Sequence, residues 1–154
     1  MRTSHHIEVP VAASEAFAYL ADVRNEIDWR ESVVGSRYVD ADAPDMGVEG
    51  ETVAEMGGNG VEMRWVITGY LPGEFVAWTL DGEPWSGGGS YRVAPTETGC
   101  RVEAALTVRV KPHLRVLEPV LWFAFRKGLR GDLARLAEIL TQRSHRQDAA
   151  VDQP

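Results

Sequence analysis

The most regular pattern in the chain is an alternation of apolar and polar positions. Between residues 100 and 110 the even-numbered positions are apolar, and polar or charged side chains occupy most of the odd-numbered positions. Shorter alternations of the same kind cover residues 5–9 and 61–67. This two-residue period predicts β-strands that have one buried face and one face in water.

Four more strands are predicted from short apolar segments bounded by turn residues. They cover residues 33–40, 48–56, 75–80 and 89–94. Gly57-Gly58-Asn59-Gly60 predicts a hairpin turn, and Pro72-Gly73 has the order of a type II turn. The glycine-rich Ser86-Gly87-Gly88-Gly89-Ser90 lacks the residues of a phosphate-binding loop. We therefore interpret it as a flexible connection into the strand that follows.

Two short helices are predicted between the first two strands. Pro10 ends the first strand, because proline cannot donate a hydrogen bond to a neighbouring strand. Ser14 is the expected N-cap of the helix that follows, and Phe17 and Leu20 give that helix an apolar face. A second helical segment is expected over residues 23–29.

After Pro112 the period of the apolar residues changes from two to three or four. The residues that recur at this spacing are Leu114, Leu117, Leu121, Phe125, Leu129, Leu133, Leu136 and Leu140. The pattern predicts one face of a long amphipathic helix, which is long enough to cover the sheet. We therefore expect Leu121, Phe125 and Leu133 to be buried against the strand at residues 100–110.

The order of these elements indicates a single α+β domain. A strand, two short helices, six strands and a long helix follow one another, and consecutive strands usually pair antiparallel. The predicted fold is a curved seven-stranded antiparallel sheet around the long C-terminal helix, with the two short helices closing a cavity. Residues 1–142 form this ligand-binding domain, and residues 143–154 form a polar tail that frays from Gln147.

Composition and charge narrow the expected partners and compartment. The 154 residues carry a net charge of −7 with the basic residues scattered among acidic ones, which argues against nucleic acid as a partner. No apolar segment is long enough to span a membrane, and the N-terminus has no apolar signal sequence. The single Cys100 cannot form an internal disulfide, so we expect a cytoplasmic protein. The sequence leaves a homodimer as one alternative for the oligomeric state.

Several short segments carry a family resemblance through their order and spacing. They are Ile7-Glu8-Val9-Pro10, residues 14–22, Trp29, residues 48–52, 67–72 and 76–78, and Leu133-Ala134-Arg135-Leu136. Over residues 5–141 the chain resembles the helix-grip superfamily of pollen-allergen and START proteins, and within it the bacterial polyketide cyclase/dehydrase family. The resemblance implies a helix-grip fold that binds a hydrophobic ligand. Some members of the family cyclise or dehydrate aromatic polyketides.

Five large apolar or aromatic residues are candidates for contact with such a ligand. They are Met63, Trp65, Trp78, Tyr91 and Trp122. All fall in elements that should border the cavity, and together they would line a space of roughly a few hundred Å³. Large flat side chains with a polar tip suit an aromatic or polyketide-like ligand. Ordinary core packing is the alternative for each of them.

The candidate catalytic residues are Tyr38, Tyr91 and Arg126. The resemblance implies that Arg and Tyr side chains in the pocket hold an enolising ketone, because they stabilise developing enolate charge in a dry site. No complete catalytic set matches the sequence, and Arg126 alternatively extends to solvent. Tyr70 faces inward only if a β-bulge precedes it. No metal site and no cofactor are expected, because no three ligands converge in the sequence pattern.

Three functions are compatible with these observations. The first is a polyketide cyclase/dehydratase, and the second is a non-catalytic carrier or sensor of a lipid or other hydrophobic molecule. A protein-interaction role is the weakest of the three, because the sequence shows no exposed apolar stripe that would dock a partner.

Overall fold

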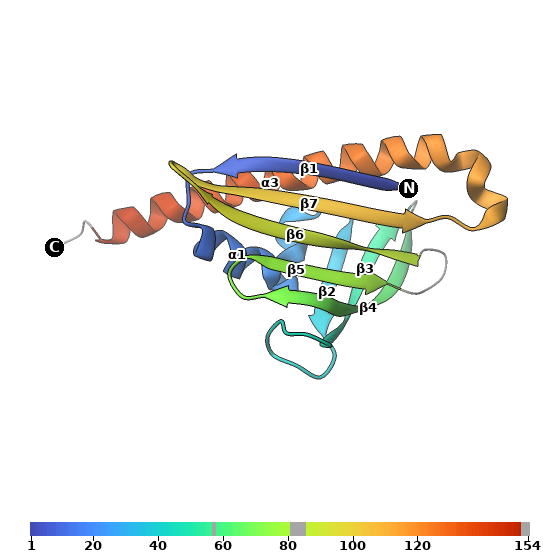
Figure 1. Cartoon of the computed structure of the whole chain (residues 1–154), viewed down its shortest axis with the longest axis horizontal. Helices are drawn as coiled ribbons and strands as arrows, with labels where there is room; N and C mark the ends of the chain where they lie inside the picture. The colour runs from blue at the N-terminus through green and yellow to red at the C-terminus, as the bar shows by residue number, and fades with distance from the viewer. Residues whose placement is uncertain (57, 81–85, 152–154) are drawn as a thin grey trace.

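Seven strands form one antiparallel sheet in the computed structural model of the chain, and a long helix runs beside it (Figure 1). The structure describes residues 1–56, 58–80 and 86–151. The strands are β1 (Arg2–Val9), β2 (Val33–Tyr38), β3 (Glu49–Met56), β4 (Asn59–Leu71), β5 (Phe75–Leu80), β6 (Ser86–Thr96) and β7 (Gly99–Arg109). The predicted α+β architecture is confirmed.

The order of the strands determines where the short helices lie. The order is β1-β7-β6-β5-β4-β3-β2, so the first and second strands occupy opposite edges of the sheet. The chain between them must therefore cross one face of the sheet. It does so as α1 (Ala13–Ala21), η1 (Val23–Asn25) and α2 (Glu26–Trp29). The helix α1 packs against β6 and β7, and α2 packs against β2.

The first helix begins earlier than the predicted cap at Ser14. Ala12 occupies the N-cap position without a side-chain capping bond, and Ser14 lies exposed within the first turn. The prediction of a Ser14 cap is therefore wrong. Burial of Val11, Ala16 and Phe17 fixes the start of α1, and this burial outweighs a cap worth about 1 kcal/mol.

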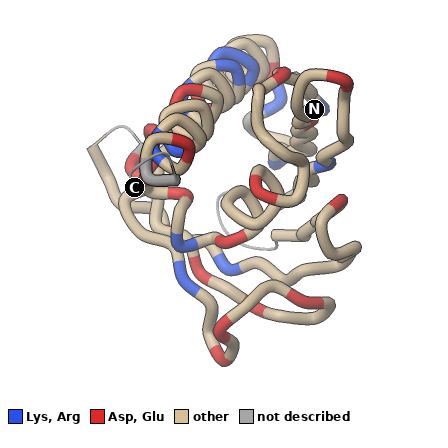
Figure 2. The backbone as a smooth tube through the Cα atoms, turned by 90° about the vertical axis from the view of Figure 1, so that its left-hand side faces the viewer, with Lys and Arg blue, Asp and Glu red and all other residues tan. Residues whose placement is uncertain are grey.

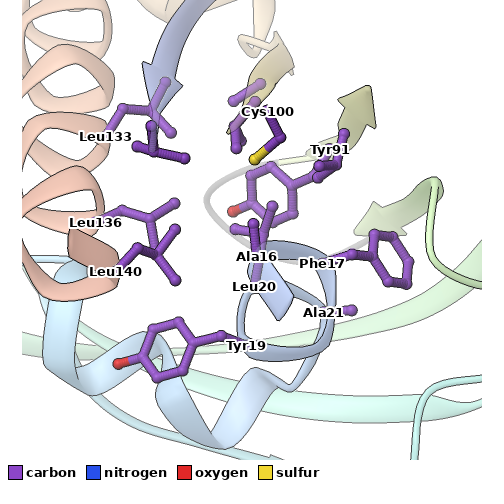
Figure 3. Packing of buried hydrophobic residues seen from close by; sticks show 14 of the residues in the cluster. Ala16, Phe17, Tyr19, Leu20, Ala21, Tyr91, Cys100, Leu133, Leu136 and Leu140 are labelled. Atoms are coloured by element: carbon purple, nitrogen blue, oxygen red, sulfur yellow. The ribbon is translucent and has the colours of Figure 1, made fainter. Parts of the chain in front are cut away.

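The long helix α3 (Glu118–Val151) follows a 3-10 segment, η2 (Pro112–Leu117). Its buried face carries Leu129, Leu133, Leu136 and Leu140. In Figure 3 the last three of these leucines point from α3 toward α1 and the sheet. The helix continues to Val151, so the segment expected to fray is helical up to that residue, and residues 152–154 lie outside the described part.

The first turns of α3 depart from the prediction. Leu121 and Phe125 are only half-buried, whereas Leu133 is fully buried as expected. The reason is that this part of α3 lies along β1, which is the edge strand, and not over the face of the sheet. Phe125 thus borders a shallow hollow with Arg2 and Leu106.

Turn and bulge predictions are confirmed where the structure describes them. The first hairpin is confirmed with Gly58 in its turn, but Asn59 and Gly60 of the predicted turn belong to β4, where Asn59 pairs with Met56, and Gly57 lies outside the described residues. Gly73 has a φ of 79°, the left-handed conformation that a type II turn requires. A register shift between Ile67 and Gly69 supplies the bulge that turns Tyr70 toward Phe17, with ring centroids 6.0 Å apart.

The glycine-rich segment is part of β6 and not a flexible connection. Gly87, Gly88 and Gly89 pair with β5 on one side and with β7 on the other. A Cβ atom on Gly88 would overlap the carbonyl oxygen of Trp78, and one on Gly89 would lie 2.6 Å from the Trp78 ring. The missing side chains therefore allow a close approach between strands, which the sequence does not distinguish from a loop.

Candidate functional site

A cavity lies between the sheet and the short helices. Its sheet wall consists of Trp65, Ile67, Val76, Trp78 and Tyr91, and its helical wall consists of Leu20, Ala21, Val23, Glu26 and Arg30. Its volume is about 40 Å³, well below the size expected from the sequence. The aromatic side chains of the sheet wall occupy much of the space beneath the helices.

Trp65 is held in place on three sides. Its cross-strand partner is Gly50, and a Cβ atom at that position would overlap the indole ring. The indole Nε1 donates a hydrogen bond to Oγ1 of Thr52 at 2.9 Å. The Tyr38 ring meets the indole edge-on, with centroids 6.2 Å apart. Trp65 therefore presents a positioned aromatic surface to the cavity.

Trp78 and Tyr91 form the second aromatic part of the wall. Trp78 pairs across the strands with Gly89, which leaves room for its ring against the sheet. The centroids of Trp78 and Tyr91 are 4.6 Å apart, and Trp29 meets Tyr91 edge-on at 5.8 Å. Burial raises the pKa of Tyr91, so its hydroxyl is a neutral phenol at ordinary pH and can donate a hydrogen bond.

An ion pair between a buried carboxylate and a half-buried guanidinium lies on the helical wall. Glu26 is 6% exposed, and its Oε1 accepts a hydrogen bond from the guanidinium of Arg30 at 3.0 Å. The spacing of four residues brings the two side chains together at the end of α2. Such a pair is stable away from water only when further hydrogen bonds satisfy its oxygens and protons.

A chain of hydroxyl groups provides those further bonds. Ser36 donates to Oε2 of Glu26 at 3.0 Å, and the hydroxyls of Ser36 and Thr52 are 2.8 Å apart. The Thr52 hydroxyl also lies 3.5 Å from Oε2 of Glu26, so either hydroxyl can donate to the carboxylate while the other donates to its neighbour. The chain therefore runs from Trp65 through Thr52 and Ser36 to Glu26. It links the orientation of the indole to the carboxylate.

Arg30 remains charged at the cavity. Desolvation lowers the pKa of Arg30, but the carboxylates of Glu26 and Asp132 and the Tyr91 hydroxyl more than offset this, so its pKa lies above the ordinary value. Its Nε lies 4.0 Å from Oδ2 of Asp132 on α3. Desolvation raises the pKa of that carboxyl, while a bond from the Glu31 backbone and the nearby Arg30 oppose the rise. A guanidinium in a largely apolar cavity can hold a carbonyl, enolate or carboxylate oxygen.

Three of the residues predicted from the sequence meet in this cavity. Trp65, Trp78 and Tyr91 all line it, whereas Met63 is not among its lining residues. Tyr38 lies behind Trp65, where its hydroxyl donates to the carbonyl of Ala21 at 3.2 Å. Tyr38 therefore connects the sheet to α1 and does not reach the open space.

The structure places Trp122 and Arg126 away from the cavity. Trp122 is 37% exposed, and its indole Nε1 donates to the carbonyl of Arg2 at 3.4 Å. The Arg126 guanidinium stacks over the Trp122 ring at 5.0 Å. The expectation that these residues face the ligand is corrected, because the first turns of α3 lie beside β1 and the short helices close the cavity.

The polar residues of the helical wall were not predicted from the sequence. Glu26 and Arg30 stand four residues apart in a segment predicted to be helical, which is the spacing of a same-face ion pair. That signal indicates the pair but not its burial. Its position over Trp65 and Tyr91 depends on how the short helices cross the sheet.

Within residues 1–56, 58–80 and 86–151, no three His, Cys, Asp or Glu side chains are grouped to hold a metal ion. Among these residues no helix combines the length and the apolar character needed to cross a bilayer.

Comparisons with known proteins add a family and a set of structural relatives. A family model described as polyketide cyclase/dehydrase and lipid transport matches residues 1–143. No curated protein matches the sequence significantly.

Three solved structures illustrate the likeness of the fold. TTHA0849 from Thermus thermophilus has a TM-score of 0.77 at 14% identity, over 94% of this chain and 98% of that chain. The di-domain ARO/CYC StfQ from the steffimycin biosynthetic pathway has a TM-score of 0.76 at 16% identity, over 94% and 52%. A START superfamily protein from Mycobacterium smegmatis has a TM-score of 0.69 at 16% identity, over 95% and 98%. At these identities the likeness concerns the fold alone, which is the predicted helix-grip fold.

Proposed function

We propose that this chain, which belongs to the polyketide cyclase/dehydrase and lipid transport family, binds a small aromatic or polyketide-like molecule in the cavity beneath its short helices. One observation carries the proposal. Trp65, Trp78 and Tyr91 form an aromatic wall opposite the Glu26–Arg30 pair, so one cavity offers both stacking surfaces and a half-buried cation. Stacking selects a flat apolar body, and Arg30 selects an oxygen at one end of it.

Binding must enlarge the cavity. An apolar cavity that binds benzene in another protein measures about 150 Å³, and the present volume is about 40 Å³. A ligand with one or more aromatic rings therefore requires the helical wall to move away from the aromatic wall. Quenching of tryptophan fluorescence should report this change directly.

The test is a fluorescence titration with emodin, a flat aromatic polyketide. We expect saturable quenching, and we expect Trp65→Ala and Trp78→Ala each to weaken binding about tenfold through lost stacking and burial. The control is Arg64→Ala, because Arg64 is exposed and points away from the cavity next to Trp65 in β4. Equal affinities for all three variants and the parent would contradict the proposal.

Two roles fit a ligand bound in this way. As a cyclase/dehydratase, the protein would use the Arg30 guanidinium and the Tyr91 hydroxyl to stabilise an enolate oxygen of a poly-β-ketone. As a carrier or sensor, it would use the same groups only to hold an oxygen of the ligand. Tyr91→Phe separates the roles, since it removes a proton donor and keeps the aromatic ring.

The two roles predict different results for that variant. The cyclase/dehydratase role is supported if Tyr91→Phe turns over a poly-β-ketone thioester at least tenfold more slowly than the parent protein and keeps its affinity for emodin. Arg126→Ala is the matched control, because Arg126 stacks on Trp122 outside the cavity. Emodin binding without turnover by the parent protein supports the carrier.

The buried, free Cys100 supports our further proposal of a reducing, cytoplasmic location.

A further inference from the structure

The outer side of η2 and of the first turns of α3 is apolar and uncovered. Val116 in η2 and Val120 and Phe123 in α3 are 88%, 69% and 65% exposed. Val120 and Phe123 are three residues apart and share one side of α3, and Val120 is opposite the buried Leu129. Leu117 and Trp122 flank them and are also exposed. We call these five residues the α3 patch.

The patch contradicts the expectation that the protein has no exposed apolar stripe. In the sequence, Leu117 belongs to the predicted core-facing stripe and the other four patch residues are interleaved with it, so the two faces merge into one apolar segment; the exposure of Leu117 corrects that prediction. The structure separates them, because only one side of α3 packs on β1 and the core. Contiguous exposed apolar residues of this size usually mark a binding surface.

Positive charge surrounds the α3 patch. Residues 109–131 contain six of the 16 basic residues of the chain and one of its 23 acidic residues. Arg115, Lys127 and Arg130 are exposed, and the last two continue the side of the helix that carries Phe123. Figure 2 shows Lys and Arg on the turns of α3 that lie away from its C-terminal end. This distribution is unusual in a chain whose net charge is −7.

We propose that the α3 patch docks on the surface of an anionic lipid bilayer. The apolar side chains would enter the boundary between headgroups and acyl chains, and the basic side chains would contact the lipid phosphates. A helix face with apolar residues in the centre and Lys or Arg around them fits a flat anionic surface. The acidic remainder of the molecule would then face away from the membrane.

The charges favour a membrane over a second copy of the chain. In a symmetric contact through the α3 patch, Lys127 and Arg130 at one end of the patch would meet either the same residues or Arg115 of the second copy, and like charges in contact are unfavourable. An anionic surface instead pairs with every basic residue of the region. The proposal is independent of what the cavity binds, since α3 does not line it.

Vesicle flotation tests the proposal with the full chain. The vesicles are phosphatidylcholine alone, or equal parts of phosphatidylcholine and phosphatidylglycerol. We expect binding only to the anionic vesicles, and loss of that binding in Val120→Ser/Phe123→Ser. Lys127→Gln/Arg130→Gln should weaken binding about fivefold for each charge removed. All four side chains are exposed, so the variants should keep the fold, which circular dichroism checks.

Matched controls use exposed residues on other elements. Val34→Ser/Leu71→Ser replaces apolar side chains that are 57% and 52% exposed, and Arg101→Gln/Arg146→Gln removes two exposed charges. Both control variants should bind anionic vesicles like the parent protein. Equal binding to both kinds of vesicle, no binding at all, or equal losses in the controls would overturn the proposal. Two other results would also overturn the proposal. One is light scattering that shows a dimer of the parent protein which the Val120→Ser/Phe123→Ser variant does not form, and the other is binding of an acidic protein, but not of vesicles, to the patch.

Discussion

At the scale of single residues, two tryptophan–glycine pairs set the shape of the cavity. Trp65 lies over Gly50 and Trp78 lies over Gly89, each across a pair of neighbouring strands. A glycine opposite a tryptophan lets the indole lie flat on the sheet. Any side chain there would push the ring toward the short helices and into the space that a ligand needs.

The first prediction at this scale concerns Gly50. Gly50→Ala should displace Trp65, weaken emodin binding and lower the free energy of unfolding by about 1–3 kcal/mol through overpacking. Gly60→Ala is the control in the same hairpin, because a Cβ atom there meets only Val53 at an ordinary 3.8 Å. Urea denaturation and fluorescence titration of both variants check the prediction. A Gly50→Ala protein as stable as Gly60→Ala would contradict it.

The second residue-scale prediction concerns the pH dependence of stability. Burial raises the pKa of Tyr38 from 10.0 to about 12, while a bond from the Val23 backbone acts in the opposite direction. Between these pH values the unfolded chain loses the phenol proton and the folded protein keeps it. The free energy of unfolding must therefore fall as the pH rises through this window.

Tyr38→Phe removes this contribution. The variant should lose stability less steeply over the window, by about 1 kcal/mol per pH unit at most. Urea denaturation of both proteins at several pH values gives the two slopes. Parallel slopes would show that Tyr38 titrates in the folded protein as it does in the unfolded chain.

At the scale of elements, α3 combines a packed half with an exposed half. Leu133, Leu136 and Leu140 point into the core shared with α1 (Figure 3), whereas the first turns lie along the edge strand. Gly128 and Gly131 lie between these halves. A Cβ atom on either would meet nothing within 4 Å, so close packing against the sheet does not explain them.

The prediction for this element follows from helix propensity. Gly128→Ala and Gly131→Ala should each raise the free energy of unfolding by about 1 kcal/mol, because alanine favours the helix and has room there. Thermal and urea denaturation check the change. A decrease in stability would show that the glycines allow a bend in α3 that the folded protein requires.

At the scale of the whole molecule, the period of the apolar residues predicts most of the architecture. Strand parity placed Trp65 on the inner face of the sheet, and the strand assignments placed Trp78 and Tyr91 beside it. Met63 has the parity of Trp65 but does not line the cavity. The change of period marked α3. The period identifies a face of α3 but not where the helix lies along the sheet, so the prediction for Trp122 and Arg126 failed. Glu26 and Arg30 were not predicted as site residues for a related reason. Their position over the cavity depends on β1 and β2 lying at opposite edges of the sheet.

The ligand is proposed to enter the cavity between the short helices and the aromatic wall. Two-dimensional nitrogen–proton NMR can locate it there, because each of the five Trp indoles gives its own signal. On addition of emodin, we expect the indole signals of Trp65 and Trp78, assigned with the Trp→Ala variants, to shift and saturate together. The signal of Trp122, on the exposed part of α3, should stay in place. Unchanged Trp65 and Trp78 signals, or a shift confined to Trp122, would contradict the account.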